Sequence, residues 1–409
     1  MTHLTAPGAL DPGFNGGARQ TITPSGLASK IRSLLPLADG AMLVASSGDP
    51  TSTFAINLFN ADGSLPSPEA FGNSVSSRGH GYLLDSFSSA RPIPQLHGYQ
   101  NNEFHVLSFQ REGVYMARYN AAGLPQARHL VDFSALPTGA VAEGPMLSAA
   151  DGELLYVAFT VTLLNADTLV AVMCITADGA LNPAFNGTGV QLVHLPDSIT
   201  RASALRGLGI QRQGANAGKV VLAGGWAAGA TDEGLYVTRL NTNGELDSTF
   251  GERGFAWVAA DQYSFMQLIV DPADTLKLCG SLRDREASQR TREVAIAWNA
   301  EGAMDRSFND GVALLETYSG PVSGVRGPVV FSSSEQAGAY RLACLKWFNT
   351  QQIIMAALGG TGHMDEAMGR VWLTVAGSMG NSTGGAVAHD VDGKMLASWH
   401  SSVFRVLGR

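Results

Sequence analysis

One short phrase recurs along the chain and limits the folds that are open to it. Its clearest copies are ITADGALNPAFNGTG at 175–189, LNTNGELDSTFGERG at 240–254 and WNAEGAMDRSFNDG at 298–311. With the weaker copies included, the turn glycines lie on average about 59 residues apart, and they are Gly8, Gly63, Gly123, Gly179, Gly244, Gly302 and Gly362. A fixed period of this length predicts stacked repeats, each of which buries its apolar face only against its neighbours.

The residue types of the phrase explain why it should form a tight turn. Asn, Asp and Gly tolerate the positive φ that a turn between antiparallel strands requires. Leu or Met follows the glycine at +2 in most copies, and Asp or Asn, which accepts backbone N–H groups, follows at +3. At +6 five copies carry a large apolar residue, namely Phe14, Phe185, Phe250, Phe308 and Met368. In another copy, Pro66 and Pro68 lie in an insertion that moves Phe71 to +8. We interpret these residues as structural anchors.

A second turn divides each repeat, as in LADGAMLVA at 37–45, AADGELLYVA at 149–158 and DVDGKMLAS at 390–398. Apolar strand patterns flank both turns and no helical periodicity is sustained, so each repeat should hold about four strands. Four antiparallel strands of this kind form a propeller blade, and the strand nearest the axis should precede the second turn. The sequence thus predicts an all-β, seven-bladed β-propeller of four-stranded blades, folded as a single domain over residues 1–409.

The two ends of the chain predict how the ring closes. The first copy of the phrase, at 8–17, lacks a preceding strand, and the last strand pattern, at 402–407, stops where that strand is missing. The N- and C-terminal strands should therefore share one blade, which removes two exposed sheet edges.

The LNTNGELDSTFGERG phrase, together with turns such as VDGKMLASW, resembles the bacterial delta-sixty repeat family, a group of uncharacterised β-propeller repeats. The resemblance extends from Gly8 to Arg409 and is most specific at 175–189, 240–254 and 298–311. It implies a propeller fold, and it carries no agreed activity or catalytic residue.

Composition and charge exclude several classes of protein. Charged residues are 15% of the chain, the net charge is −8, and Lys and Arg form no run, so a nucleic-acid surface is not expected. The most apolar stretch, 154–175, is interrupted around Asn165 and is too short for a membrane helix. The start of the chain has no signal-peptide pattern, and Cys174, Cys279 and Cys344 lie far apart in apolar runs. We expect a cytoplasmic monomer, with signal-independent export left open.

Sequence motifs for cofactors, metals or catalysis are missing, and the candidates that resemble them are better explained as turns of the repeat. The Asp-rich turns at 60–63 and 390–393 lead directly into apolar strands instead of supplying further calcium ligands. The glycine cluster at 358–369 aligns with the repeat phrase and lacks a phosphate-loop ending. The nine histidines are scattered without ligand spacing. No metal and no cofactor is therefore predicted.

The turns repeat while the polar loops differ, as in WAAGATDEG, LRDREASQRTRE and KWFNTQQ. Identical ligand sites in every blade would need repeated loops, so the pattern favours one asymmetric site at the axial mouth or a single partner-binding face. We expect loops that enter the innermost strands to line that mouth. The candidate ligand-binding residues are Arg78, His80, His194, Asp197, Arg201, Asp261, Tyr263 and Tyr318, with Glu316 beside the last.

These observations favour a soluble binding or interaction protein whose partner is a small polar ligand or another protein. The alternative is a propeller enzyme, namely a hydrolase, lyase or isomerase with an axial acid–base pair that acts on a polar metabolite or sugar. Ionisable side chains that converge on a buried axial pocket would favour the enzyme, and a flat apolar face would favour a protein partner.

Overall fold

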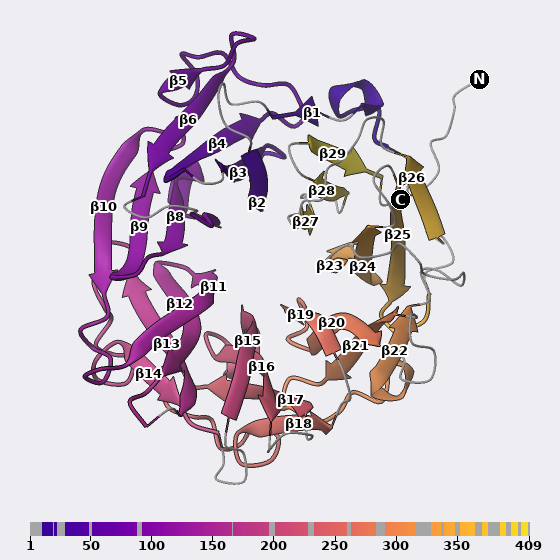
Figure 1. Ribbon diagram of the computed structural model, residues 1–409. Helices are drawn as coiled ribbons and strands as arrows, with labels where there is room; N and C mark the ends of the chain where they lie inside the picture. The colour runs from indigo at the N-terminus through magenta and orange to yellow at the C-terminus, as the bar shows by residue number, and fades with distance from the viewer. Residues whose placement is uncertain are drawn as a thin grey trace.

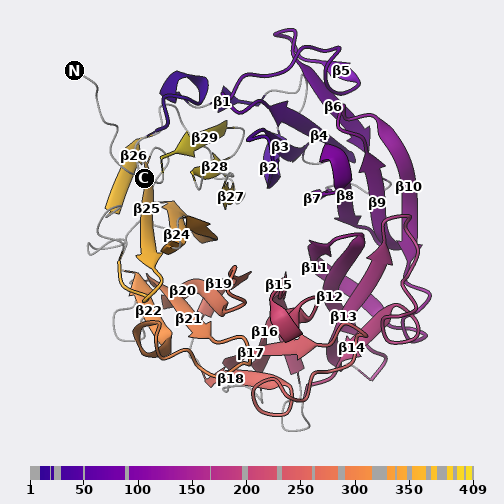
Figure 2. The same cartoon turned by 180° about the vertical axis from the view of Figure 1, so that it is seen from behind.

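The computed structural model describes residues 10–18, 20–22, 29–48, 51–87, 92–165, 167–195, 201–227, 233–259, 263–283, 291–315, 329–336, 339–347, 352–364, 370–374, 385–389, 394–399 and 402–407. Their strands form antiparallel sheets arranged radially around one axis (Figures 1 and 2). Short 3-10 turns, η1 to η4, interrupt the connections at Asn15–Gly17, Gln100–Asn102, Gly214–Asn216 and Asn309–Gly311.

Each sheet is built outward from the axis. The strands that surround the centre are β2 (Ser29–Pro36), β7 (Gln95–Gly98), β11 (Val141–Asp151), β15 (Arg201–Ile210), β19 (Tyr263–Val270), β23 (Val329–Gln336) and β27 (Gly385–His389). The second strands are β3 (Met42–Gly48), β8 (Phe104–Phe109), β12 (Leu154–Thr162), β16 (Val220–Ala227), β20 (Leu276–Arg283), β24 (Ala339–Trp347) and β28 (Met395–Trp399). The innermost strand precedes the second turn, as predicted.

The outer half of each sheet follows the same order. The third strands are β4 (Thr53–Phe59), β9 (Gly113–Tyr119), β13 (Thr168–Thr176), β17 (Glu233–Leu240), β21 (Thr291–Trp298), β25 (Gln352–Gly359) and β29 (Ser402–Val406). The outer strands are β5 (Ser74–Val75) with β6 (Gly81–Ser86), β10 (Pro125–Asp132), β14 (Val190–Val193), β18 (Phe255–Ala259), β22 (Val312–Leu315), β26 (Arg370–Thr374) and β1 (Gln20–Thr21).

The prediction of seven four-stranded blades is wrong. Among the described residues the structure has six four-stranded blades, and the sheet with the order β2-β3-β4-β6-β5 has five strands. The difference begins at the insertion with Pro66 and Pro68, after which the chain pairs β5 with β6 as a hairpin. Close backbone packing fixes this register, because a Cβ on Gly81 would lie 2.2 Å from the Phe71 carbonyl oxygen.

One four-stranded blade is completed by both ends of the chain. Strand β1 pairs with β29, with Gln20 opposite Val403, and Leu10 forms an isolated bridge to Val406. The described N-terminal residues thus supply the outer edge of the sheet whose other strands are C-terminal, which is the closure that the sequence predicted.

The repeat phrase joins neighbouring blades. The N–H of Asn186, next to Phe185 in one phrase, donates to the Asn243 carbonyl of the following phrase at 2.6 Å. Gly244 in that following phrase has φ +87°, and a Cβ there would lie 3.0 Å from the Phe185 ring. Glycine is therefore favoured at position 244 for two reasons: the backbone has a positive φ, and the Phe185 ring packs too closely for a Cβ. The phenylalanine anchors each turn against the neighbouring blade.

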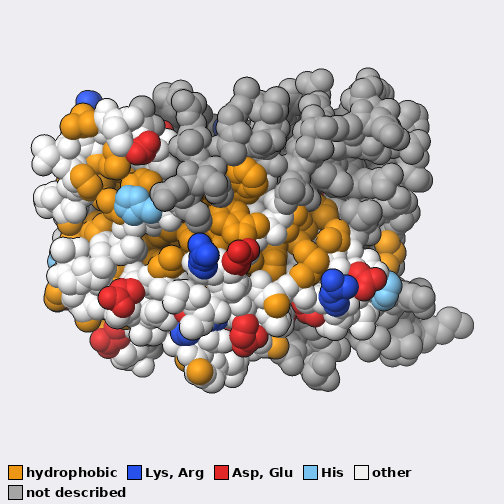
Figure 3. All heavy atoms as spheres, turned by 90° about the horizontal axis from the view of Figure 1, so that it is seen from below, with side chains coloured by type: hydrophobic (Ala, Val, Ile, Leu, Met, Phe, Trp, Pro, Cys, Tyr) orange, Lys and Arg blue, Asp and Glu red, His pale blue; other side chains and the backbone are white. Residues whose placement is uncertain are grey.

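Packing between blades forms the core. Strands β12 and β13 are buried on both faces over most of their length, which agrees with their continuous apolar sequences. Cys174 and Cys279 are buried and form no disulfide, which agrees with the sequence. On the outer wall seen in Figure 3, acidic and basic side chains are interspersed among hydrophobic ones.

Candidate functional site

A cavity of about 590 Å³ opens at the axis where the innermost strands end. Strands β2, β7, β11, β15 and β19, together with the turns that follow β7, β11 and β15, contribute its lining. This volume is in the range of small-molecule sites. The blades contribute different residue types to the lining, so the cavity is asymmetric although the blades repeat.

One wall of the cavity is apolar. It is formed by Leu208 and Ile210 of β15 and by Leu268 and Val270 of β19, whereas Leu35 of β2 lies beside Gly98 at the end of β7. The RGLGI sequence of β15 allows this wall to form, because a Cβ at the first glycine, 207, would lie 2.1 Å from the Leu268 Cβ. Glycine at this position lets β15 and β19 approach closely and place their aliphatic side chains side by side.

The opposite wall is polar and comes from the end of β7 and the turn after it. The His97 Nε2 lies 2.6 Å from the Ser148 Oγ. The Tyr99 hydroxyl donates to Glu153 at 3.3 Å, and the Gln100 amide donates to the same oxygen at 3.1 Å. These contacts tie two blades together at the rim, and they fix three polar cavity residues in place.

A second histidine lies behind this wall. His105 is opposite His97 in the β7–β8 register, is 1% exposed, and meets the Tyr99 ring edge-on at 5.0 Å between centroids. Neither ring nitrogen of His105 makes a hydrogen bond of normal geometry. Burial lowers the pKa of His97 to about 4, helped by His105. Burial also lowers the pKa of His105 to about 4, against the effect of the Ala177 backbone, which raises it, and with help from the charge of Arg118. Both imidazoles are therefore neutral at pH 7.

Arg212 stands at the rim between the two walls. Its backbone N–H donates to the Asp274 Oδ1 at 2.6 Å, and its Nη2 donates to the Ala150 carbonyl at 2.9 Å. Its Nη1 is 3.7 Å from the Asp151 carboxylate, and its side chain is 62% exposed. The arginine is thus held from the blade on each side, while its side chain lines the cavity and stays largely exposed to solvent.

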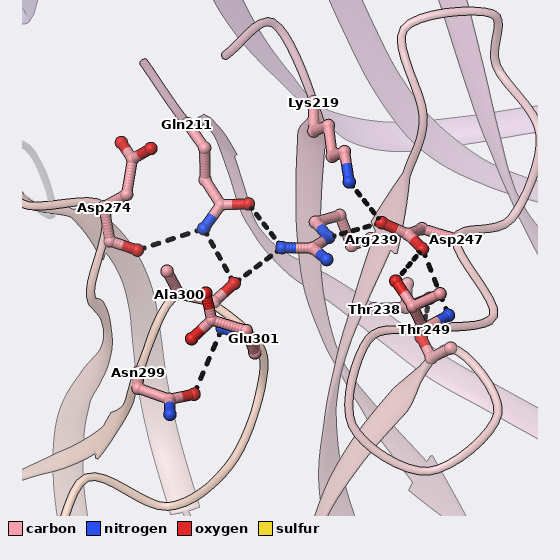
Figure 4. A network of polar contacts seen from close by, with 11 residues as sticks. Gln211, Lys219, Thr238, Arg239, Asp247, Thr249, Asp274, Asn299, Ala300 and Glu301 are labelled. Carbon is pink, nitrogen blue, oxygen red and sulfur yellow. Dashed lines mark hydrogen bonds and ion pairs between the residues drawn. The ribbon is translucent and has the colours of Figure 1, made fainter. Parts of the chain in front are cut away.

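A buried polar network supports the turn that carries Arg212 (Figure 4). The neighbouring Gln211 donates to the Asp274 and Ala300 carbonyls, both at 3.0 Å. Arg239 donates to the Gln211 amide oxygen at 3.0 Å and to the Ala300 carbonyl at 2.6 Å. Four segments from two blades are therefore joined next to Arg212, namely those that carry Gln211, Arg239, Asp274 and Ala300.

The network ends at Asp247, the +3 residue of its phrase. Asp247 accepts from the Arg239 Nε at 2.9 Å and from the Lys219 Nζ at 2.8 Å. Burial alone would raise the pKa of Asp247, but hydrogen bonds from Lys219 and Thr249 and the charge of Arg239 outweigh burial and lower it. The carboxylate therefore stays ionised and serves as an anchor, as its place in the repeat predicted.

The residues predicted for the site lie in several places. Arg78 and His80 are in the β5–β6 turn, at the outer edge of the five-stranded sheet. His194 is exposed just after β14, the outer strand of its blade. These three residues are not brought together with the cavity lining, although Arg78 and His80 share a smaller hollow next to Asn57.

Two predicted residues begin innermost strands, namely Arg201 in β15 and Tyr263 in β19. The cavity is at the other ends of these strands, so their role at the opposite mouth stays a prediction. The remaining predicted residues, Asp197, Asp261 and Tyr318, and Glu316 with them, lie outside the described residues.

The sequence reasoning missed His97, Tyr99, Gln100 and Arg212. A signal was available in the length of the second turns. Most copies of the second turn are short, as in LADGA, whereas HGYQNNEF and QRQGANAGK have longer, polar connections. A longer polar connection directly after an innermost strand marks the rim of this mouth.

Within the ranges that the structure describes, no cluster of three His, Cys, Asp or Glu side chains could hold a metal ion. In those same ranges, no helix has the length and apolar character that a membrane span requires.

Residues 218–250 match a family described as a β-propeller domain of unknown function (DUF5122). This match and the fold support an uncharacterised β-propeller family, and the delta-sixty repeat name stays a resemblance. No curated protein matches the chain significantly.

Solved structures with related folds share little sequence with the chain. The polysaccharide lyase Uly1 is 11% identical, with a TM-score of 0.54 over 99% of this chain and 98% of that one. A protein of unknown function from Dyadobacter fermentans is 13% identical, with a TM-score of 0.46 over 87% and 98%. Drosophila Plexin A in complex with Semaphorin 1b gives 10% identity and a TM-score of 0.47 over 99% and 88%. At such identities the lyase comparison shows the fold alone.

Proposed function

We propose that the protein is a binding protein with one asymmetric small-ligand site, the axial cavity. The observation that carries this proposal is a cavity of about 590 Å³ whose lining comes from five different sheets. Repeated structural positions here hold different residues: Leu35, His97 and Gly209 are each the next-to-last residue of their innermost strand, and all three line the cavity. When equivalent positions of a repeat scaffold carry different residues around a cavity, the cavity is suited to bind one ligand in one orientation.

A blocking variant tests the location of the site. Gly98 lines the cavity, and a Cβ there would meet no atom nearer than the Leu35 methyl groups at 3.9 Å. Gly98→Trp should therefore fill the cavity without a backbone clash. Gly359→Trp is the matched control, because a Cβ at Gly359 also has its nearest neighbour at 3.9 Å but lies at the end of β25, away from the cavity.

Native mass spectrometry of the protein in a mixture of small metabolites gives the readout. We expect one bound mass per chain in the wild type and in Gly359→Trp, and its loss in Gly98→Trp. Equal binding by all three proteins would place the site elsewhere, and no bound mass in the wild type would contradict a small-ligand function.

An acid–base enzyme is the second candidate, and His97 with Tyr99 in the cavity lining is the observation that favours it. His97 is a neutral potential base at pH 7, and burial together with Glu153 raises the pKa of Tyr99, which keeps its proton. Conversion of the captured compound, seen as a new product mass, would establish the enzyme. The loss of that product in Tyr99→Phe, with binding retained, would assign the acid.

A further inference from the structure

We propose that the axial cavity takes an amphipathic anion, with its carboxylate at Arg212 and its aliphatic or aromatic body against the apolar wall. This inference rests on the proposed function, because it names the ligand class of the same cavity. It departs from the small polar ligand that the sequence suggested.

The charge of the lining favours an anion. Of the described residues that line the cavity, Arg212 is the one with a formal charge at neutral pH, since His97 is neutral. The nearby carboxylates do not line the cavity, and each has a partner. Glu153 accepts from Tyr99 and Gln100, and Asp151 lies 3.7 Å from Arg212.

Arg212 is held ready for a carboxylate. The Asp274 carboxylate fixes its backbone, and the Ala150 carbonyl fixes one side of its guanidinium. A guanidinium presents five N–H donors in a planar fork, so the bond to the Ala150 carbonyl and the looser contact of Nη1 with Asp151 at 3.7 Å still leave donors, and a ligand carboxylate would compete with Asp151 for this arginine. Because the side chain is already positioned, the ordering cost of binding is reduced.

The rest of the lining favours an apolar body over a sugar. Leu208, Ile210, Leu268 and Val270 line the cavity along β15 and β19 with aliphatic side chains that offer no hydrogen bonds to hydroxyl groups. The aromatic ring of the cavity is partly engaged, since the Arg118 guanidinium lies 5.9 Å from the Tyr99 centroid. The Tyr99 hydroxyl and the Gln100 amide both donate to Glu153. Among the described lining residues, few polar side-chain groups therefore remain for a sugar.

Fluorescence of 8-anilinonaphthalene-1-sulfonate, an amphipathic anion, provides a direct probe of the folded protein. We expect one probe molecule per chain, displaced by decanoate at concentrations about tenfold lower than by decylamine or by a neutral decyl glucoside. Arg212→Gln should weaken the probe and decanoate about tenfold and leave decyl glucoside unchanged. Arg306→Gln, which changes an exposed arginine of a phrase turn, is the control and should bind like the wild type.

The outcomes separate this inference from the proposed function. If Gly98→Trp abolishes binding while decylamine competes as well as decanoate, the cavity is a binding site and the anion inference is wrong. Probe binding that survives Arg212→Gln unchanged also overturns the inference, as does the absence of probe binding to the wild type. Unaltered binding in Gly98→Trp contradicts the cavity itself. Unfolding midpoints of all variants, measured in urea, verify that each one is folded.

Discussion

Two blades carry the same cluster of charges among the described residues, one a continuous blade and the other the blade formed by both the N- and C-terminal strands. In the continuous blade, Asp247 binds Arg239 at 2.9 Å and Lys219 at 2.8 Å, as Figure 4 shows. In the closing blade, Asp11 binds Arg405 at 2.7 Å and lies 3.1 Å from the Lys394 Nζ. We call these the inner cluster and the closing cluster.

The two clusters also reach the next blade in the same way. Arg239 donates to the Ala300 carbonyl at 2.6 Å and lies over the Phe250 ring at 4.9 Å. Arg405 donates to the Ala61 carbonyl at 2.7 Å and lies over the Phe14 ring at 5.1 Å. The local bonding is therefore nearly the same in the two places.

What differs is the chain between the partners. Eight residues separate Asp247 from Arg239, whereas 394 separate Asp11 from Arg405. If the inner cluster breaks, the chain still holds its phrase next to β17. If the closing cluster breaks, the N-terminal phrase has only non-covalent contacts to keep it in place. Equal contacts should therefore have unequal consequences for local opening.

The largest expected effect comes from removing the arginines. Arg405→Ala and Arg239→Ala should each lower the free energy of unfolding by about 3–5 kcal/mol, because each leaves a buried carboxylate short of a partner. Only Arg405→Ala should also expose its phrase to solvent. Urea unfolding gives the first quantity, and hydrogen exchange of 10–18 against 246–254 gives the second. If the two phrases are equally protected from hydrogen exchange in both variants, the two clusters do not differ in local opening and the comparison is wrong.

The glycines that cover each phenylalanine give a smaller effect. A Cβ on Gly63 would lie 2.9 Å from the Asn15 nitrogen, and one on Gly302 would lie 2.8 Å from the Phe250 ring, with φ positive at both glycines. We expect Gly63→Ala and Gly302→Ala each to cost about 1–3 kcal/mol. Faster hydrogen exchange at 10–18 in Gly63→Ala, without faster exchange at 246–254 in Gly302→Ala, would show that the N-terminal phrase opens more readily than the inner one. Gly187→Ala is the control for φ alone, because a Cβ there meets no atom within 4 Å.

The histidine pair and the two charge clusters should lose their contributions to stability at different pH values. His97 and His105 have pKa values of about 4 in the folded protein against 6.5 for an ordinary histidine. The unfolded chain binds these protons first, so stability is complete above pH 6.5 and is lost as the pH falls toward 4. For the buried His105 the loss should approach about 3 kcal/mol. His105→Phe should reduce the slope of urea-derived stability against pH between these values and leave the part that belongs to His97, and an unchanged slope would contradict the assignment.

The clusters should respond at lower pH. Burial raises the pKa of Asp11, but the Gly13 N–H and the charges of Lys394 and Arg405 outweigh burial, so the pKa of Asp11 is lowered. The pKa of Asp247 is lowered in the same manner. Their stabilisation is present above the ordinary aspartate value of 3.8 and is lost as the pH falls below it. Exposure of 10–18 that begins already in the histidine range would show that the closing cluster is not what holds the phrase.

The sequence predicted most of the scaffold because the phrase carries its own local rules. Turn glycines, the apolar residue at +6 and the strand order within a blade depend on neighbours that recur with the period. The fifth strand was missed because its register depends on Gly81 packing against Phe71, which spacing alone does not reveal. An axial site was predicted, but its lining residues were not, because residues such as His97, Leu208 and Leu268 come to one cavity only when distant strands converge.

The smallest expected effect belongs to the lysines. Lys219 and Lys394 are 18% and 28% exposed, and each adds a second cation to a carboxylate that keeps its arginine. Lys219→Met and Lys394→Met retain the apolar stem and should cost about 1 kcal/mol or less, with the larger cost at the less exposed Lys219. Urea unfolding at low and high salt measures both, and salt should reduce the difference from the wild type more for Lys394→Met. A larger cost at Lys394 would mean that closing the ring relies on the second cation, and that the two clusters differ in their charges as well as in the length of chain between their partners.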